Sequence, residues 1–201
     1  LKDIGEQAVN SSFNRITVDG ETSTNDAFTL ISTGCGDSDP IKTKDDPRYS
    51  EVLHAVCEVC SELAKDIVRD GEGATKLVSI KVRGAKSEED ALAVGYSVAE
   101  SALVKTALFA EDPNWGRILS AVGASGIVEL DIDKVDLFIG DYKVANQGSI
   151  DEGYQEDDVA EIMKKNEFEI CIDLNYACSE ATVWTCDLSY DYIRINSEYR
   201  S

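Results

Sequence analysis

The fold class of this chain is decided by one segment, Leu77-Val78-Ser79-Ile80-Lys81-Val82-Arg83-Gly84-Ala85-Lys86-Ser87-Glu88-Glu89-Asp90. Apolar side chains alternate along its first half and share one face, which predicts a β-strand over residues 77–82. Ser87, followed by three acidic residues, resembles a capping box and predicts a helix that runs toward Leu103. A strand that leads into a capped helix indicates an α/β chain.

Helices and strands continue to alternate on both sides of this segment. The patterns predict further helices over residues 1–12, 52–70, 115–122 and 157–165, and further strands over 13–20, 27–32, 135–139, 168–174 and 181–185. We expect the late strands to pair antiparallel and the residues from Tyr190 onward to form a helical or irregular tail. No Pro-rich or Ser-rich linker divides the chain, so we predict an α/β fold in which mixed sheets are layered with helices.

The longest predicted helix follows a polar loop, residues 34–47, and ends near Gly71, where glycine can supply a left-handed cap. Apolar residues recur along this helix at spacings of three and four. That spacing predicts a buried stripe made of Val52, Val56, Val59, Cys60, Leu63 and Ile67.

The cysteines indicate a reducing compartment. Cys57 and Cys60 form a Cys-x-x-Cys pair, but the pair lies within the predicted helix and no second pair completes a zinc site. A chain with so large a core also does not need a disulfide framework. We therefore expect core or surface thiols, with a metal or redox role for the pair as the alternative, at Cys35, Cys57, Cys60, Cys171, Cys178 and Cys186. The expected location is the cytoplasm, or an organelle in a eukaryote.

The composition excludes several classes of protein. Among 201 residues there are 39 Asp and Glu but only 19 Lys and Arg, which gives a net charge of −20 and a pI near 4.3. So acidic a chain is not expected to bind nucleic-acid backbones or anionic membranes non-specifically. No apolar run approaches the ~20 residues that span a bilayer. A single His excludes a multi-His metal site, and 43% hydrophobic residues suffice for one domain or two small ones.

Four polar segments carry candidate chemistry, and the residues alone leave a structural and a functional interpretation of each. Residues 17–26 form either a hairpin turn or a loop that faces a substrate. In residues 70–76, Glu72 either follows a helix cap into solvent or binds an amine or moves a proton. Residues 105–117 form either a structural turn or a ligand site. Residues 196–201 either fray or fold into a pocket.

Together these segments resemble one family, the bifunctional ornithine acetyltransferase/N-acetylglutamate synthase of arginine biosynthesis. Residues 12–26 look like the segment that lies soon after the family's self-cleavage point, and they read Ser12-Phe13-Asn14-Arg15-Ile16-Thr17-Val18-Asp19-Gly20-Glu21-Thr22-Ser23-Thr24-Asn25-Asp26. The other matching motifs follow in family order: Glu72-Gly73-Ala74-Thr75-Lys76, Leu103-Val104-Lys105-Thr106-Ala107, Asp112-Pro113-Asn114-Trp115-Gly116-Arg117, Cys186-Asp187-Leu188-Ser189-Tyr190-Asp191-Tyr192 and Asn196-Ser197-Glu198-Tyr199-Arg200-Ser201. The resemblance covers essentially the whole chain.

The resemblance implies an ornithine acetyltransferase-like (DmpA/ArgJ-like) fold and a cofactor-free acyl transfer. The family's precursor cuts itself at an Ala-Thr bond into an α chain and a β chain, and the freed Thr takes acetyl from N-acetylornithine and passes it to glutamate. The α chain supplies the oxyanion hole. The implied partner of this chain is therefore the α chain, in an α2β2 heterotetramer. Bifunctional members would also acetylate glutamate from acetyl-CoA.

The same resemblance assigns residues 1–201 to the β chain without its N-terminal segment. The chain begins at Leu1 rather than Met, so we expect a fragment or a processed product, with the nucleophilic Thr upstream of Leu1. Thr17, Thr22 and Thr24 belong to another family motif and do not replace it. The substrate-binding residues carried over from the family motifs are Glu72, Asn196 and Ser201, and no metal ligand is expected.

Two other functions compete with this one. The first is an N-terminal-nucleophile amidase or aminopeptidase of the same fold, in which water replaces glutamate as the acceptor. The second is a structural or binding subunit that has lost the nucleophilic Thr.

Overall fold

The computed structural model describes residues 1–23 and 25–199, which form two compact units. The N-terminal unit comprises residues 1–16 and 21–67, and the C-terminal unit comprises residues 17–20 and the chain from Val68 onward. Thr24 and Ser201, which the sequence singled out, lie outside the described residues.

Helices dominate the N-terminal unit. Helix α1 covers Lys2–Ser11 and a 3-10 turn covers Phe13–Arg15. Strand β1 is only the pair Ile16–Thr17, of which Thr17 belongs to the C-terminal unit, so the predicted strand over 13–20 is mostly wrong. The strand predicted over 27–32 is also wrong, because this segment joins no β-ladder. The ring of Phe28 instead packs against Phe13, with 5.5 Å between ring centroids. Apolar residues at strand spacing do not make a strand without a partner to pair with.

Helix α2, Pro47–Arg69, confirms the longest predicted helix, but only Cys60 of the predicted buried stripe is buried. Val52, Val59, Leu63 and Ile67 are 40–60% exposed, whereas the buried positions are Cys60, Ala64 and Val68. The 3.6-residue period was correct and the choice of face was not, since periodicity alone does not identify what covers an apolar face. The predicted left-handed cap at Gly71 is wrong as well, because the positive φ of +69° lies at Gly73.

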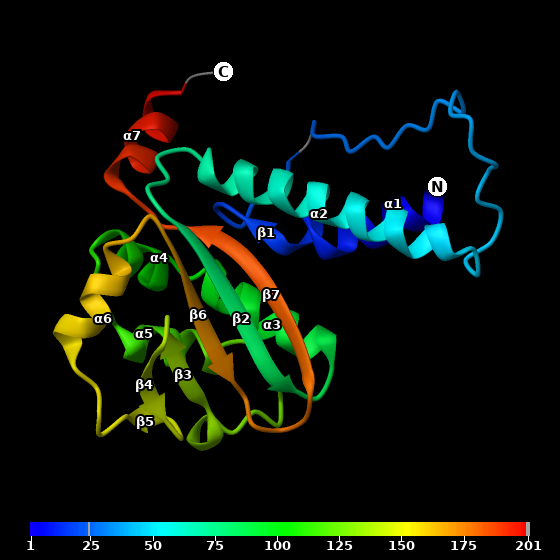
Figure 1. Ribbon diagram of the computed structural model, residues 1–201. Coiled ribbons are helices and arrows are strands. Elements are labelled where there is room, and N and C mark those ends of the chain that lie inside the picture. The colour runs from blue at the N-terminus through cyan, green and yellow to red at the C-terminus, as the bar shows by residue number, and fades with distance from the viewer. Residues whose placement is uncertain (24, 200–201) are drawn as a thin grey trace. The chain divides into compact units, whose positions relative to one another are not determined.

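The C-terminal unit is built on a seven-stranded sheet with the order β1-β7-β2-β6-β3-β4-β5 (Figure 1). Strands β2 and β6 pair in parallel, and β2–β7, β3–β6, β3–β4 and β4–β5 pair antiparallel. The late strands do pair antiparallel as predicted, but β2 separates β6 from β7. The strands cover Leu77–Ala85 (β2), Asp136–Ile139 (β3), Tyr142–Asn146 (β4), Ser149–Ile150 (β5), Glu167–Asp173 (β6) and Ser179–Cys186 (β7).

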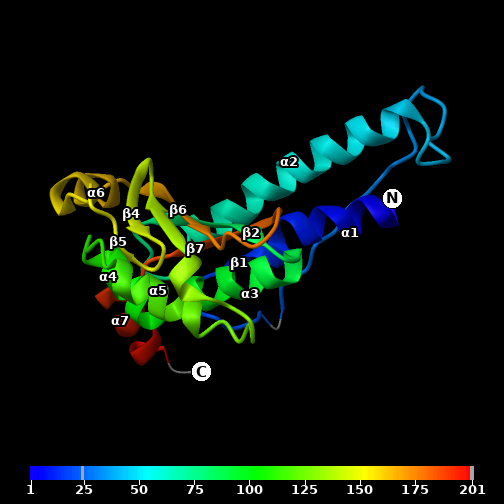
Figure 2. The same cartoon turned by 90° about the horizontal axis from the view of Figure 1, so that it is seen from below.

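Helices α3, α4 and α5 all lie on one side of this sheet (Figures 1 and 2). Ile80, Ile170 and Val183 are fully buried and share one cluster with Val94 of α3 and Val122 of α5. The predicted mixed α/β architecture is therefore confirmed. The helices cover Glu88–Ala99 (α3), Ala102–Phe109 (α4), Trp115–Gly123 (α5), Glu156–Met163 (α6) and Tyr190–Glu198 (α7), and a 3-10 turn covers Ile132–Lys134.

The helix predicted from Ser87 toward Leu103 is in fact two helices. Ser87 caps α3 as predicted, since its Oγ accepts the Asp90 amide at 3.1 Å. Ser101 then caps α4 by accepting the Val104 amide at 3.4 Å. Across the described residues no single helix has the length and apolar character to cross a membrane. Helices α3 and α4, which are bent by 59° relative to each other, reach that length and apolar character only when they are taken together.

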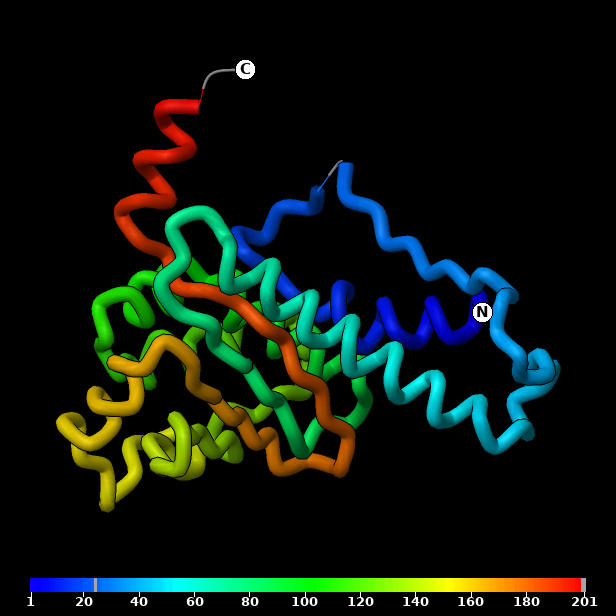
Figure 3. Tube along the Cα trace, turned by 45° about the horizontal axis from the view of Figure 1, so that its top comes forward, coloured from blue at the N-terminus to red at the C-terminus, as the bar shows by residue number. Residues whose placement is uncertain are grey.

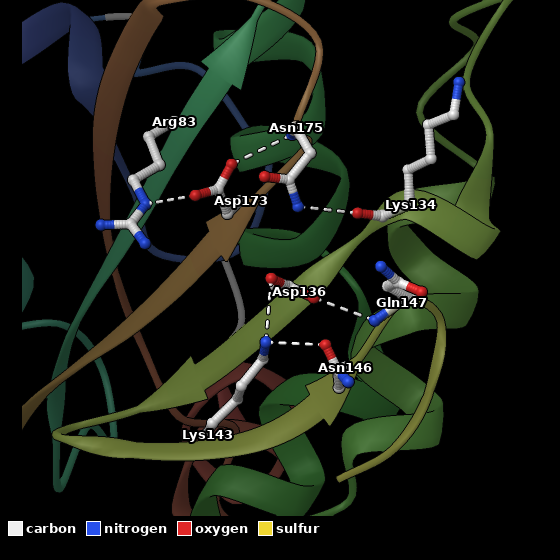
Figure 4. Close-up of polar contacts among 8 residues, drawn as sticks. All are labelled: Arg83, Lys134, Asp136, Lys143, Asn146, Gln147, Asp173 and Asn175. Carbon is white, nitrogen blue, oxygen red and sulfur yellow. Dashed lines mark hydrogen bonds and ion pairs between the residues drawn. The ribbon is translucent and has the colours of Figure 1, made fainter.

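A polar network fastens the ends of β2, β6, β3 and β4 (Figure 4). Asp173 accepts from Arg83 Nε at 2.7 Å and from the Asn175 amide at 3.0 Å. On the next strand Asp136 accepts from Lys143 Nζ at 3.0 Å and from the Gln147 amide at 2.9 Å. These two carboxylates stand opposite each other in the register, so each needs its own cation.

Candidate functional site

The turn that carries Glu72 lies beside the first turn of α7 (Figure 3). Glycine is required at position 73 because the backbone has a positive φ and because α7 comes very close. A Cβ atom there would lie 2.5 Å from the Tyr192 nitrogen and 2.8 Å from Ser189 Oγ. Gly73 thus serves the close packing of this turn against α7, whereas a Cβ atom at Gly71 would lie 3.1 Å from Val18 and from the Val68 carbonyl.

Two of the three predicted site residues come together. Asn196 Nδ2 on α7 donates to Glu72 Oε2 at 2.7 Å and to its own helix carbonyl at Tyr192 at 3.0 Å. Both side chains belong to exposed residues, so a ligand can reach them. The third, Ser201, lies outside the described residues. The fraying interpretation of the tail is wrong as far as Glu198, because residues 190–198 form a helix.

Asp187 holds the end of the turn. Although it is only 3% exposed, its carboxylate accepts three hydrogen bonds: from the Thr75 amide at 2.8 Å, from Thr75 Oγ1 at 2.7 Å and from the Lys76 amide at 3.0 Å. Sequence reasoning missed this role and quoted Asp187 only within a family motif. A signal was present, since an Asp that directly follows an alternating strand is well placed to accept backbone amides.

Ser189 joins the turn to α7. Its hydroxyl donates to the Gly73 carbonyl at 2.6 Å and accepts the Asp191 amide at 3.2 Å, which caps the helix. The one short segment from Asp187 to Ser189 therefore contacts the turn of Glu72 at two places and also starts the helix that carries Asn196.

A second carboxylate is held on the same side of α7. Tyr192 Oη donates to Asp19 Oδ2 at 2.9 Å, and Tyr192 lies four residues before Asn196, which is one helical turn. Asp19 belongs to residues 17–20, where the Gly20 amide donates to Thr17 Oγ1 at 3.0 Å. These bonds show a local turn at residues 17–20, but no hairpin, because no strand follows it among the described residues before α2, and the interpretation as a loop that faces a substrate stays a prediction.

Lys105 is only 2% exposed, and its ammonium lies at the end of β7, which Asp187 follows in the chain. Its ammonium donates to Thr185 Oγ1 at 3.0 Å and to the Cys186 carbonyl, and Cys186 Sγ lies 3.6 Å away. Burial lowers the pKa of Lys105, opposed by the nearby Cys186 and Asp187. Burial likewise raises the pKa of the Cys186 thiol, opposed by Lys105.

The rest of residues 105–117 supports the structural interpretation. Asn114 caps α5, because its Oδ1 accepts the Arg117 amide at 3.2 Å. Arg117 Nη1 donates to the Leu103 carbonyl at 3.0 Å, and Asp112 accepts from Asn114 Nδ2 at 3.0 Å, so these polar side chains bond locally.

All six cysteines carry free thiols. Within residues 1–23 and 25–199, no group of three or more His, Cys, Asp or Glu side chains is placed to hold a metal ion. What the Glu72–Asn196 pair can do chemically is bind an ammonium group: the carboxylate supplies the charge and the amide oxygen a second acceptor.

Comparisons with known proteins agree over the whole chain. The model of the ArgJ family matches residues 1–201. The Arginine biosynthesis bifunctional protein ArgJ of Pseudomonas syringae pv. tomato is 47% identical over 201 residues, and that of Pseudomonas fluorescens is 46% identical. Each alignment takes in 100% of this chain and 50% of the relative, so the chain spans about half the length of these curated relatives.

A solved structure shares the fold. The crystal structure of Arginine biosynthesis bifunctional protein argJ from Bacillus halodurans superposes with a TM-score of 0.93 at 37% sequence identity, over 98% of this chain and 92% of that one. The expected DmpA/ArgJ-like fold is thereby confirmed.

Proposed function

Because this chain belongs to the ArgJ family, we propose that it is the β-chain part of an enzyme that moves acetyl from N-acetylornithine to glutamate. The acetyl group passes through an ester on a Thr upstream of Leu1, so the reaction needs no cofactor and runs as two acyl transfers. The relatives are named as bifunctional proteins of arginine biosynthesis, which supports this chemistry.

The observation that carries the proposal is the pairing of Glu72 with Asn196 on an exposed surface. N-acetylornithine carries a free ammonium group on its side chain, and a carboxylate with a neighbouring amide binds such a group well. We assign Glu72 and Asn196 to this contact, with Ser201 as the third residue. The donor that Glu72 pairs with is neutral, so its negative charge is left for a substrate ammonium to form an ion pair with.

The proposed partner is the α chain from the same precursor, in an α2β2 assembly. The relatives are twice as long as this chain, which supports a missing half. The exposed apolar side chains of α2 also support a partner chain, because covering Val59 and Leu63 with another surface would be favourable. The proposed location is the cytoplasm, or an organelle in a eukaryote.

A second acetyl donor follows from the word bifunctional in the relatives' names. We propose that acetyl-CoA can load the same Thr, so that the enzyme also makes N-acetylglutamate without N-acetylornithine.

The test uses the full-length, self-cleaved protein. It is incubated with N-acetylornithine in the presence and absence of glutamate, and the products are separated. N-acetylglutamate should form in step with ornithine, and little acetate should appear. Equal acetate release with and without glutamate, and no N-acetylglutamate, would replace the transferase by a hydrolase of the same fold. Replacing N-acetylornithine by acetyl-CoA in a parallel reaction tests the second donor.

A further inference from the structure

We propose that Asp187 is a positioning residue, which holds the turn of Glu72 in the place where its carboxylate can contact the ammonium group of the substrate. The inference rests on the proposed function, because it concerns the contact that Glu72 makes there with an ammonium group.

The cost of burial is the first argument. Asp187 and Lys105 are both almost fully buried, and an isolated charge in such a place is strongly destabilising. Three hydrogen bonds to the Asp187 carboxylate offset the cost of burying it. The bond from the Lys105 ammonium to the Cys186 carbonyl offsets part of the cost of burying Lys105. Attraction between Lys105 and Asp187 also opposes the effect of burial on the pKa of Lys105. These hydrogen bonds therefore stabilise one conformation of this chain segment.

The direction of the bonds is the second argument. Every hydrogen bond that Asp187 accepts comes from Thr75 or Lys76, at the end of the turn, and Ser189 holds the Gly73 carbonyl near its start. Glu72 directly precedes this fastened stretch. Ser189 also begins the helix of Asn196, so the segment from Asp187 to Ser189 sets the spacing between the two site residues.

Thr75→Val tests this from the exposed side. It removes one hydrogen bond to the carboxylate at nearly constant volume, whereas Asp187→Ala would leave the Thr75 and Lys76 amides without their acceptor and can fail to fold. Loss of a bond to a charged group predicts a KM for N-acetylornithine about five- to tenfold higher, with kcat within about twofold. The matched control is Thr106→Val, because the Thr106 hydroxyl donates only to carbonyls of its own helix at Ala102 and Leu103. A KM that stays within about twofold, or that rises equally in both variants, overturns the proposal.

A double variant asks whether the effect passes through Glu72. We call the hydrogen bonds from Thr75 and Lys76 to Asp187 the clamp. In the Glu72→Gln background, Thr75→Val should raise the KM no further, because the charge that the clamp positions is already gone. Independent, additive increases would show that the clamp acts on something other than Glu72, which also overturns the proposal.

Hydrogen exchange separates this inference from the proposed function. If the wild-type enzyme transfers no acetyl to glutamate, the proposed function fails, and the clamp is then judged by exchange in the peptide over residues 70–76. Exchange there should be about fivefold faster in Thr75→Val than in Thr106→Val, since the Thr75 and Lys76 amides bond to the same carboxylate. Equal exchange in the two variants overturns the clamp.

Discussion

In the proposed function, the charge of Glu72 and its neutral partner Asn196 make this residue pair a receptor for a cation. The 2.7 Å bond from Asn196 aligns the carboxylate without neutralising it. A Gln at position 72 keeps the volume and the hydrogen bond but loses the charge. The consequence of that change therefore distinguishes binding from folding.

We predict that Glu72→Gln raises the KM for N-acetylornithine about tenfold or more, since a charge-assisted bond of about 1.5–3 kcal/mol is lost. Steady-state kinetics with the self-cleaved enzyme measure this, and the melting temperature should move by less than about 2 °C. The control is Glu152→Gln, the same change at an exposed residue in the loop that follows β5. Parallel losses of activity and thermal stability in Glu72→Gln would indicate a structural role instead.

The turn before β2 and helix α7 pack together and form the proposed site. Ser189, Asp187 and Gly73 bring the turn and the helix into contact, and each does so by a backbone group or a very close approach. A site built on backbone contacts is precise because few torsions remain free in it.

Gly73→Ala should therefore weaken substrate binding as well as cost the free energy of placing an alanine at a positive φ. Gly126 has a similar positive φ, +81°, but a Cβ there meets nothing within 4 Å, so Gly126→Ala carries only the conformational cost of about 1 kcal/mol. Thermal unfolding of both variants measures that common cost. Only Gly73→Ala should also raise the KM for N-acetylornithine, by about tenfold, because the turn must move away from α7. Equal KM values in the two variants would contradict a packed turn.

The strand-end network predicts a pH dependence. Burial opposes ionisation of Asp136, but the Gln147 amide and Lys143 outweigh it, so the pKa of Asp136 lies below its usual value. The folded state then binds this proton less readily than the unfolded chain does. The stabilisation is complete above the unfolded pKa of about 4 and is lost as the pH falls through the lower, folded pKa.

Asp136→Asn should accordingly lower the urea midpoint at about pH 7, by a loss of about 1 kcal/mol, and have a smaller effect at about pH 3. Asp141→Asn, an exposed residue of the neighbouring β3–β4 turn, should change neither midpoint. The same deficit for Asp136→Asn at both pH values would show that its charge does not stabilise the fold.

At the scale of the whole molecule, the largest departure from expectation is the exposed face of α2. Its apolar residues have the right helical spacing, yet Val59 is 60% and Leu63 is 50% exposed. An apolar face of this kind commonly marks an interaction surface, and the proposed occupant is the α chain. The net charge of −20 favours cationic ligands for the molecule as a whole but does not locate a site.

Leu63→Glu should therefore prevent the two chains from remaining together. Size-exclusion chromatography of the self-cleaved protein should show separated chains or a smaller assembly, because a charge is buried without a partner. Val128→Glu makes the same change at a residue that is 97% exposed in a loop, and it should leave the assembly intact. An unchanged assembly in Leu63→Glu would remove α2 from the proposed interface.

The local patterns of the chain were sufficient for most elements and for part of the site. Alternation marked β2, β3, β6 and β7, and Ser87 marked the start of α3, because these signals depend on neighbours within one turn or one strand. Glu72 and Asn196 were found through motifs, since their bond joins residues 124 positions apart that no periodicity connects.

By itself, then, the sequence determined the α/β class, the acidic charge and the residues whose chemistry suits a cation. Only the tertiary structure decided that β2 lies between β6 and β7, that α2 exposes its apolar side and that Asp187 clamps the turn of Glu72. The physical reason is the same for all three. Periodicity and capping depend on residues that are close in sequence. The order of the strands, the face of α2 that is buried and the burial of Asp187 depend on which residues distant in sequence pack together and exclude water.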